Sequence, residues 1–197
     1  TVVLERLVRE LNGVECTDFE PEPPASKATA VTRCFGEPVS DVDALREAMV
    51  RRAVRAAEKI RNQGLAATRL IAFAHGSRFK PNAPSASRVG RLSPATNDPR
   101  VIAGMAARMA EAMFETGRVY TKCGVMLEGL ERMAAHQADL FAKPDPRSPA
   151  LLSAIDGLNG RFGRNTMRLA SEGFGTKSYD TKRAFKSPSW TTRIDQV

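Results

Sequence analysis

Two spacings of apolar residues alternate along the chain and predict a succession of strands and helices. Residues 40–64 carry apolar side chains every three or four positions, as expected for one face of an α-helix. Residues 97–117 repeat this spacing, and they open with Asp98 and Pro99, a cap and a first-turn residue typical of helices. Runs rich in β-branched and aromatic residues predict four strands, at residues 29–39, 67–77, 85–94 and 119–130.

The order of these elements, β-α-β-β-α-β over residues 29–130, predicts a fold of the α+β class. It is the ferredoxin-like, split βαβ pattern, with a four-stranded antiparallel sheet and both helices on one face. The other face of such a sheet must meet water or a partner.

Shorter segments flank this predicted domain of residues 29–133. Residues 1–13 are predicted to form an amphipathic helix, and residues 14–28 an acidic, proline-rich linker. Residues 134–147 are predicted to be a second linker. Residues 148–197 are expected to form a small α/β tail domain, with a helix at 148–160 and a strand at 166–173. Leu152, Ile155 and Leu158 of that helix are expected to face inward. Because this tail can bury little apolar surface on its own, we expect it to dock elsewhere or to order on binding.

The charge distribution suggests a polyanionic partner. The 197 residues carry a net charge of +8. Residues 1–28 contribute −3, residues 29–133 contribute +7 and residues 134–197 contribute +4, so the whole basic surplus follows the first linker. Nucleic acid is the leading interpretation of such a surplus, and a solvated surface is the alternative.

Other classes of protein are disfavoured by composition. Cys16, Cys34 and Cys123 are widely spaced and odd in number, which favours reduced thiols over a disulfide framework. No apolar run approaches the ~20 residues needed to cross a bilayer. No signal peptide opens the chain, and its start at Thr1 in mid-pattern suggests a piece of a longer protein.

The basic residues of the predicted sheet are the candidate nucleic-acid ligands. Four of them lie in or after the loop between the second and third predicted strands, with no acidic residue between them. Each of the other three strands adds one. An exposed basic sheet face can hold phosphates without reading bases. The arginines of the first long helix (Arg46, Arg51, Arg52 and Arg55) are assigned to solvation instead. The predicted DNA-binding set is Arg33, Arg69, Arg78, Lys80, Arg88, Arg91 and Lys122.

An enzymatic alternative is weakly supported. His75 lies close to Ser77 in the chain, and Cys34 could lie one strand away, so a small hydrolase remains open. No residue is placed to orient such a pair, and the sequence contains no phosphate-binding loop and no zinc-ligand motif.

Five segments in a fixed order carry a family resemblance: "RCFGEPV", "AVRAAEKIRNQG", "HGSRFKPN", "YTKCGVML" and "SPSWTTRIDQ". Together they resemble the C-terminal part of UmuC-type Y-family translesion DNA polymerases, the catalytic subunits of bacterial DNA polymerase V. The resemblance implies that residues 1–13 end the thumb, 29–133 are the little finger and 148–197 are a small C-terminal domain.

That resemblance implies a role in DNA repair and SOS mutagenesis in the bacterial cytoplasm, with no membrane partner. The little finger would lie on primer–template DNA through phosphate contacts. The palm, whose carboxylates hold Mg²⁺ in this family, lies outside the chain, so we expect no cofactor and no polymerisation by the chain alone. A UmuD-type dimer and a RecA filament are implied partners. A stand-alone nucleic-acid-binding module is the alternative.

The stretch "QADLF" sits before three prolines, an unusual place for two large apolar side chains. It resembles the pentapeptide by which bacterial polymerases bind the sliding clamp, with Gln137, Asp139, Leu140 and Phe141 as the implied ligands. Gln137 offers an amide to a polar notch, and Leu140 and Phe141 can fill apolar pockets. The alternative is a helix that continues the last strand and packs on the sheet.

Overall fold

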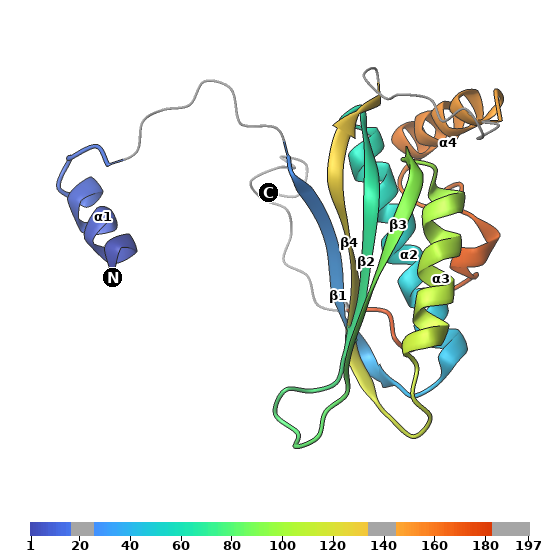
Figure 1. Ribbon diagram of the computed structural model, residues 1–197, viewed down its shortest axis with the longest axis horizontal. Helices are drawn as coiled ribbons and strands as arrows, with labels where there is room; N and C mark the ends of the chain where they lie inside the picture. The colour runs from blue at the N-terminus through green and yellow to red at the C-terminus, as the bar shows by residue number, and fades with distance from the viewer. Residues whose placement is uncertain (17–25, 134–144, 183–197) are drawn as a thin grey trace, which may run out of the picture.

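The computed structural model describes residues 1–16, 26–133 and 145–182 (Figure 1). The predicted clamp peptide, residues 137–141, lies outside these residues. In chain order the elements are α1 (Val2–Leu11), β1 (Ala28–Val39), α2 (Val42–Arg61), β2 (Leu65–His75), β3 (Ser85–Thr96), α3 (Pro99–Met113), β4 (Tyr120–Arg132), α4 (Ser148–Phe162) and the 3₁₀ turn η2 (Ala170–Glu172).

The four strands form one antiparallel sheet, and α2 and α3 cover one of its faces (Figure 1). The predicted α+β class, the succession of elements and the single helical layer are therefore confirmed. The strand order is β1-β4-β2-β3, a variant of the ferredoxin-like order, in which the first strand is central. Here β1 is an edge strand, and it is the strand that carries Pro38 and a register shift after Cys34, both typical of edges.

The hydrophobic core lies between the sheet and the two helices. The stripe predicted for α2 points into it, and Leu45, Met49 and Ile60 are completely buried. Leu70 of β2 and Leu127 of β4 meet them from the sheet with no exposed surface. Leu70 and Leu127 therefore mark the faces of β2 and β4 that point to the helices.

The second helix ends earlier than the sequence predicts. α3 stops at Met113, four residues before Gly117. The Tyr120 hydroxyl donates to the Met113 carbonyl oxygen at 3.1 Å and accepts from the Glu115 amide at 3.1 Å. A buried side chain thus satisfies backbone groups at the helix end, and Gly117, with φ of +81°, serves the turn that follows.

The tail differs from its prediction in two respects. Residues 166–173, expected to be a strand, form bends and η2, and the described residues 145–182 contain no strand. The Asn159 side chain bonds both the amide and the carbonyl of Met167, which folds this segment back onto α4. Leu158, expected to face inward with Leu152, is 38% exposed.

Candidate nucleic-acid interface

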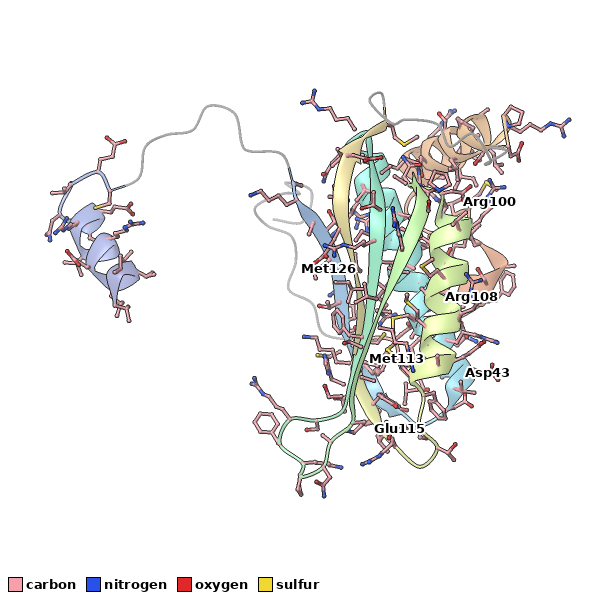
Figure 2. The ribbon with its side chains drawn as sticks, in the orientation of Figure 1. Asp43, Arg100, Arg108, Met113, Glu115 and Met126 are labelled. Carbon is pink, nitrogen blue, oxygen red and sulfur yellow. The ribbon has the colours of Figure 1, made fainter. Side chains whose placement is uncertain are left out.

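The sheet face away from the helices, here called the open face, is defined by strand register. Directly opposed residues of an antiparallel pair point to the same side. Leu70 and Ala72 point to the helices, so Arg69, Ile71 and His75 of β2 lie on the open face. Figure 2 shows Met126, opposite Ile71, on the side of the sheet away from α3.

Basic side chains lie at both ends of the open face. At one end Arg69 is opposed by Glu128 and Arg91, and at the other His75 is opposed by Lys122 and Ser85. The rows between these ends are apolar or small: Ala30, Met126, Ile71 and Val89 in one row, and Thr32, Gly124, Phe73 and Ser87 in the next. The face therefore combines a smooth middle with cationic ends.

Gly124 keeps the middle of the open face low. A Cβ atom at this position would lie 2.6 Å from the side chains of both Phe73 and Thr32. Because Gly124 has no side chain, the Phe73 ring can lie across β4 at this position. The Phe73 ring packs against the ring of His75, with the two centroids 5.4 Å apart.

The register corrects the expectation that all the strand cations share one face. Arg69, Arg91 and Lys122 lie on the open face, whereas Arg33 is opposite the buried Cys123 and Arg88 is opposite the buried Ala72. Both therefore point to the helical side. Arg88 donates from Nη2 to the Ala112 carbonyl oxygen of α3 at 3.1 Å. Their predicted part in DNA binding remains a prediction.

The loop between β2 and β3 carries the two remaining predicted cations. It extends past the end of the sheet (Figure 1), where His75 and Ser85 close the β2–β3 pairing. Arg78 lies over the ring of Phe79, 5.1 Å from its centroid, and that ring is 85% exposed. Arg78 and Lys80 are both exposed.

One open-face cation is partly neutralised. Arg69 Nη2 lies 2.9 Å from Glu128 Oε2, with Arg69 58% exposed. Arg91 and Lys122 have no ion pair among the described residues. The charge available to a polyanion on this face therefore comes chiefly from Arg91, Lys122 and the loop.

The hydrolase arrangement is not assembled. His75 Nδ1 lies 3.1 Å from the Ser85 hydroxyl and is not paired with Ser77. Lys122 stands between Cys34 and His75 in the register, so the two are separated by two strand spacings, about 10 Å. The parts of the chain that the structure describes contain no cluster of three or more metal-ligating side chains.

Arg51 of α2, which sequence reasoning assigned to solvation, instead holds the tail. Arg51 donates from Nε to the Glu172 carbonyl oxygen at 2.7 Å and from Nη1 to Asp180 Oδ1 at 3.0 Å. It also bonds Glu47 at 3.2 Å. Its guanidinium lies 5.6 Å from the centroid of the Tyr179 ring.

Backbone contact completes this docking. The Gly36 amide of β1 donates to the Tyr179 carbonyl oxygen at 3.0 Å. A Cβ at Gly36 would lie 2.1 Å from the Asp180 carbonyl oxygen, so only glycine fits there. Tyr179 packs edge-on against Phe35 at 6.0 Å and is 3% exposed, and burial raises the pKa of its hydroxyl.

A second set of contacts fixes α4. Arg61 Nε and Nη2 bond the two carboxylate oxygens of Asp156 at 2.5 and 2.7 Å. The Ser148 hydroxyl donates to Asp98 Oδ2 at 3.0 Å, so it joins two helices rather than capping its own. Burial acts to raise the pKa of Asp98, but hydrogen bonds from Arg100 and Ser148 outweigh it and lower that pKa below 3.8. The expectation that the tail docks elsewhere is thus met for residues 145–182.

Within the described residues no helix is long and apolar enough to cross a membrane. Residues 26–140 match the impB/mucB/samB family C-terminal domain, and residues 149–197 match a domain of unknown function, DUF4113. The structured sheet domain and the docked tail therefore correspond to two separately defined domains.

Protein UmuC of Salmonella typhimurium is 36% identical over 201 residues, which include 100% of this chain and 47% of that protein. Protein MucB of Escherichia coli is 35% identical over 195 residues, including 97% of this chain and 46% of that protein. Among solved structures, an insertion ternary complex of Dbh DNA polymerase matches 67% of this chain and 36% of its own, with a TM-score of 0.42 and 12% identity.

The chain spans about half the length of these bacterial relatives. Because the family's C-terminal domain matches more than half of this chain, the protein belongs to the impB/mucB/samB family, and the relationship predicted from its UmuC-type motifs is confirmed.

Proposed function

We propose that this chain is the DNA-gripping and clamp-tethering portion of an error-prone translesion DNA polymerase. Membership of the family supports the polymerase context. The observation that carries the DNA-binding part is the open face, a smooth sheet surface with cations at both ends and the helices on its far side.

Contacts to phosphate suit this role. Damage alters bases, while the phosphate track of the duplex persists, so a surface that holds phosphates tolerates lesions. The middle of the open face offers few donors or acceptors to base edges, chiefly the hydroxyls of Thr32 and Ser87, and the cations at its ends are the groups that can bind the backbone.

The test measures primer–template binding by fluorescence anisotropy as a function of salt. If about four to six phosphates are contacted, log K should fall with log salt at a slope of about −4 to −5. Changing Lys80, Arg91 and Lys122 to glutamine should flatten that slope by about 2.7, since each lost contact contributes about 0.9. Two unrelated sequences should bind about equally.

The matched control changes Arg46 and Arg108, exposed arginines of α2 and α3, to glutamine. This variant should keep the wild-type slope. If the control flattens the slope and the open-face variant does not, the DNA contact is on the helical side and the proposed grip is wrong.

The clamp tether rests on residue types alone. We propose that Gln137, Leu140 and Phe141, supported by Asp139, bind the sliding clamp as an extended peptide. Changing the first three to alanine should abolish clamp binding, because such anchors are each worth about 2 kcal/mol or more. The melting temperature should not change. Were the segment a packed helix, losing Phe141 alone would cost on the order of 3 kcal/mol of stability, with clamp affinity unaltered.

The remaining parts of the proposal concern the whole protein. The docked tail domain is proposed to meet a UmuD-type dimer or a RecA filament, and the location is proposed to be the bacterial cytoplasm. This chain alone is expected to incorporate no nucleotides with Mg²⁺, because two-metal catalysis needs clustered carboxylates. Incorporation by a pure preparation would contradict the assignment of the chain to the little finger and tail.

A further inference from the structure

A cleft of about 300 Å³ lies where the sheet domain meets the tail. Edge strand β1 contributes Arg33, α2 contributes Arg51, Arg52 and Arg55, and the tail contributes Asp180 and Thr181. Residues of both matched domains therefore line it. It lies on the helical side of the sheet, since Arg33 points away from the open face.

Two of the four arginines already have carboxylate partners. Arg51 bonds Asp180 and Glu47, so the one acidic residue among the described residues lining the cleft is already paired. Arg55 is paired with Glu58 on its own helix. These ion pairs leave the other two cationic side chains as the source of net positive charge.

Arg52 is the unusual member of the cleft. It is 7% exposed, yet no carboxylate pairs with it among the described residues. Nη1 donates to the Ala48 carbonyl oxygen at 3.0 Å, and the guanidinium lies 5.7 Å from the Phe35 ring centroid. Nε has no hydrogen-bond partner in the described structure. A buried cation and an unmade hydrogen bond both cost free energy, unless an anion compensates them.

Arg33 adds a second unpaired charge to the same cleft. It is exposed and has no ion pair among the described residues. Two guanidinium groups without counter-ions suit a ligand with more than one negative oxygen, because the guanidinium fork matches oxyanions in bidentate geometry. The Thr181 hydroxyl is a further donor in the lining.

We propose that this cleft is a phosphate-binding site, separate from the open face and formed only while the tail is docked. The phosphate can be free or can belong to the backbone of a nucleic-acid strand passing the β1 edge. The inference goes beyond the proposed grip, because none of the cleft residues except Arg33 belongs to the predicted DNA-binding set, and Arg33 points away from the open face.

The first experiment titrates the full chain with inorganic phosphate, followed by calorimetry, against chloride at equal ionic strength. Binding should saturate with phosphate only. Arg33→Gln should weaken it at least about tenfold, the effect of one lost charge-assisted hydrogen bond. The matched control, Arg46→Gln, changes an arginine of α2 outside the cleft and should leave affinity unchanged. Arg52→Gln should abolish binding if it folds, but the conclusion rests on the exposed Arg33.

Equal weakening by Arg33→Gln and Arg46→Gln, or equal effects of phosphate and chloride, would overturn the proposal. A second arm adds a short thymidine oligonucleotide without terminal phosphates. Competition between it and phosphate, lost in Arg33→Gln, would assign the site to a nucleic-acid backbone, whereas phosphate binding without competition would assign it to free phosphate.

The glutamine variant of Lys80, Arg91 and Lys122 separates the two sites. It should bind duplex more weakly, with the flatter salt slope, and retain phosphate binding in the cleft. Loss of phosphate binding in that variant would place the anion on the open face and refute the cleft site. The proposed DNA grip would stand.

Discussion

Arg51→Ala should release the tail from the sheet domain while leaving the sheet domain folded. Arg51 lies on α2, is 16% exposed, and bonds three parts of the tail: the carbonyls of Glu172 and Gly175 and the carboxylate of Asp180. No other described side chain makes as many bonds between the two domains. We expect the sheet domain to stay folded, because Tyr179 is the one described tail residue that belongs to its hydrophobic core.

The magnitude follows from the two shortest of these bonds, 2.7 Å to the Glu172 carbonyl and 3.0 Å to Asp180. A hydrogen bond to a charged group contributes about 1.5–3 kcal/mol in a site that is mostly closed to water. Asp180 is 33% exposed and regains water when it loses its partner, which offsets part of the loss. We expect undocking to become easier by about 3 kcal/mol, or on the order of a hundredfold in its equilibrium constant.

Native-state hydrogen exchange at the amide of residue 36 measures this undocking, because that amide donates to the Tyr179 carbonyl oxygen of the docked tail. Arg46→Ala is the control. Its pairs with Asp43 and Glu111 are exposed, and such pairs contribute about 0–1 kcal/mol. If the two variants change tail protection equally, Arg51 is not what holds the tail.

A second variant tests the same interface from the opposite side. Gly36→Ala places a methyl group 2.1 Å from the Asp180 carbonyl oxygen and should also undock the tail. Both substitutions act by undocking the tail, so either one leaves less docking free energy for the other to remove. The double variant Arg51→Ala with Gly36→Ala should therefore lose less docking free energy than the sum of the two single losses. Full additivity would mean that one of them acts on the sheet domain itself.

Two further predictions concern the sheet. Gly129→Ala should destabilise the fold by about 2 kcal/mol in urea denaturation, since φ is +61° and the new Cβ would lie 2.0 Å from Thr68 Oγ1. Gly117→Ala, with φ of +81° but open space around it, should cost only about 1 kcal/mol; equal costs would exclude the Thr68 contact as a cause. Iodoacetamide at pH 8 should label the exposed Cys34 and leave Cys123 intact, because burial raises the pKa of Cys123 to about 11. Equal labelling rates in folded protein would contradict that burial.

The fold could be read from the sequence because local patterns and tertiary packing agree. The stripe of α2 is apolar every three or four residues, and the same residues form the core. Asp41 and Asp98 accept the backbone amides expected of caps, at 2.8 Å in both cases. The end of α3 was mispredicted because the Tyr120 side chain, which belongs to β4 and not to the helical pattern, bonds the backbone carbonyl of the last helical residue.

The face of each cation was harder to predict. In β2 the open face carries Ile71 and Phe73, whereas the buried face carries Ala72 and Ala74, so size and polarity do not reveal which side meets the helices. Only β1 held a usable signal, since Arg33 shares its face with the apolar Val31 and Phe35, whereas Thr32 and Cys34 lie on the other face. Register, which depends on pairing between distant strands, decides the question.

The assignment of Arg51 to solvation failed for a related reason. Helical arginines are common on surfaces, and nothing local marks Arg51 or Arg61 as partners for carboxylates more than 90 residues away in the chain. Their partners lie in a segment that buries little by itself, so docking supplies the burial that the segment lacks. Tyr179 and Asp180 can be recognised as docking residues only when the structure places them beside α2.

This division of the cations changes how mutational data on such a chain should be interpreted. Arg51 and Arg61 belong to the basic surplus, yet their charge is committed to the tail, whereas Arg91 and Lys122 of the open face have no ion pair among the described residues. A charge-removing change at Arg51 that weakened DNA-dependent function would therefore act by releasing the tail and opening the cleft it closes. Under the proposed grip, a change at Arg91 would act by removing a phosphate contact. The two mechanisms differ in one observable: only the second should lower the salt dependence of duplex binding, because only it alters the number of phosphates that the protein neutralises.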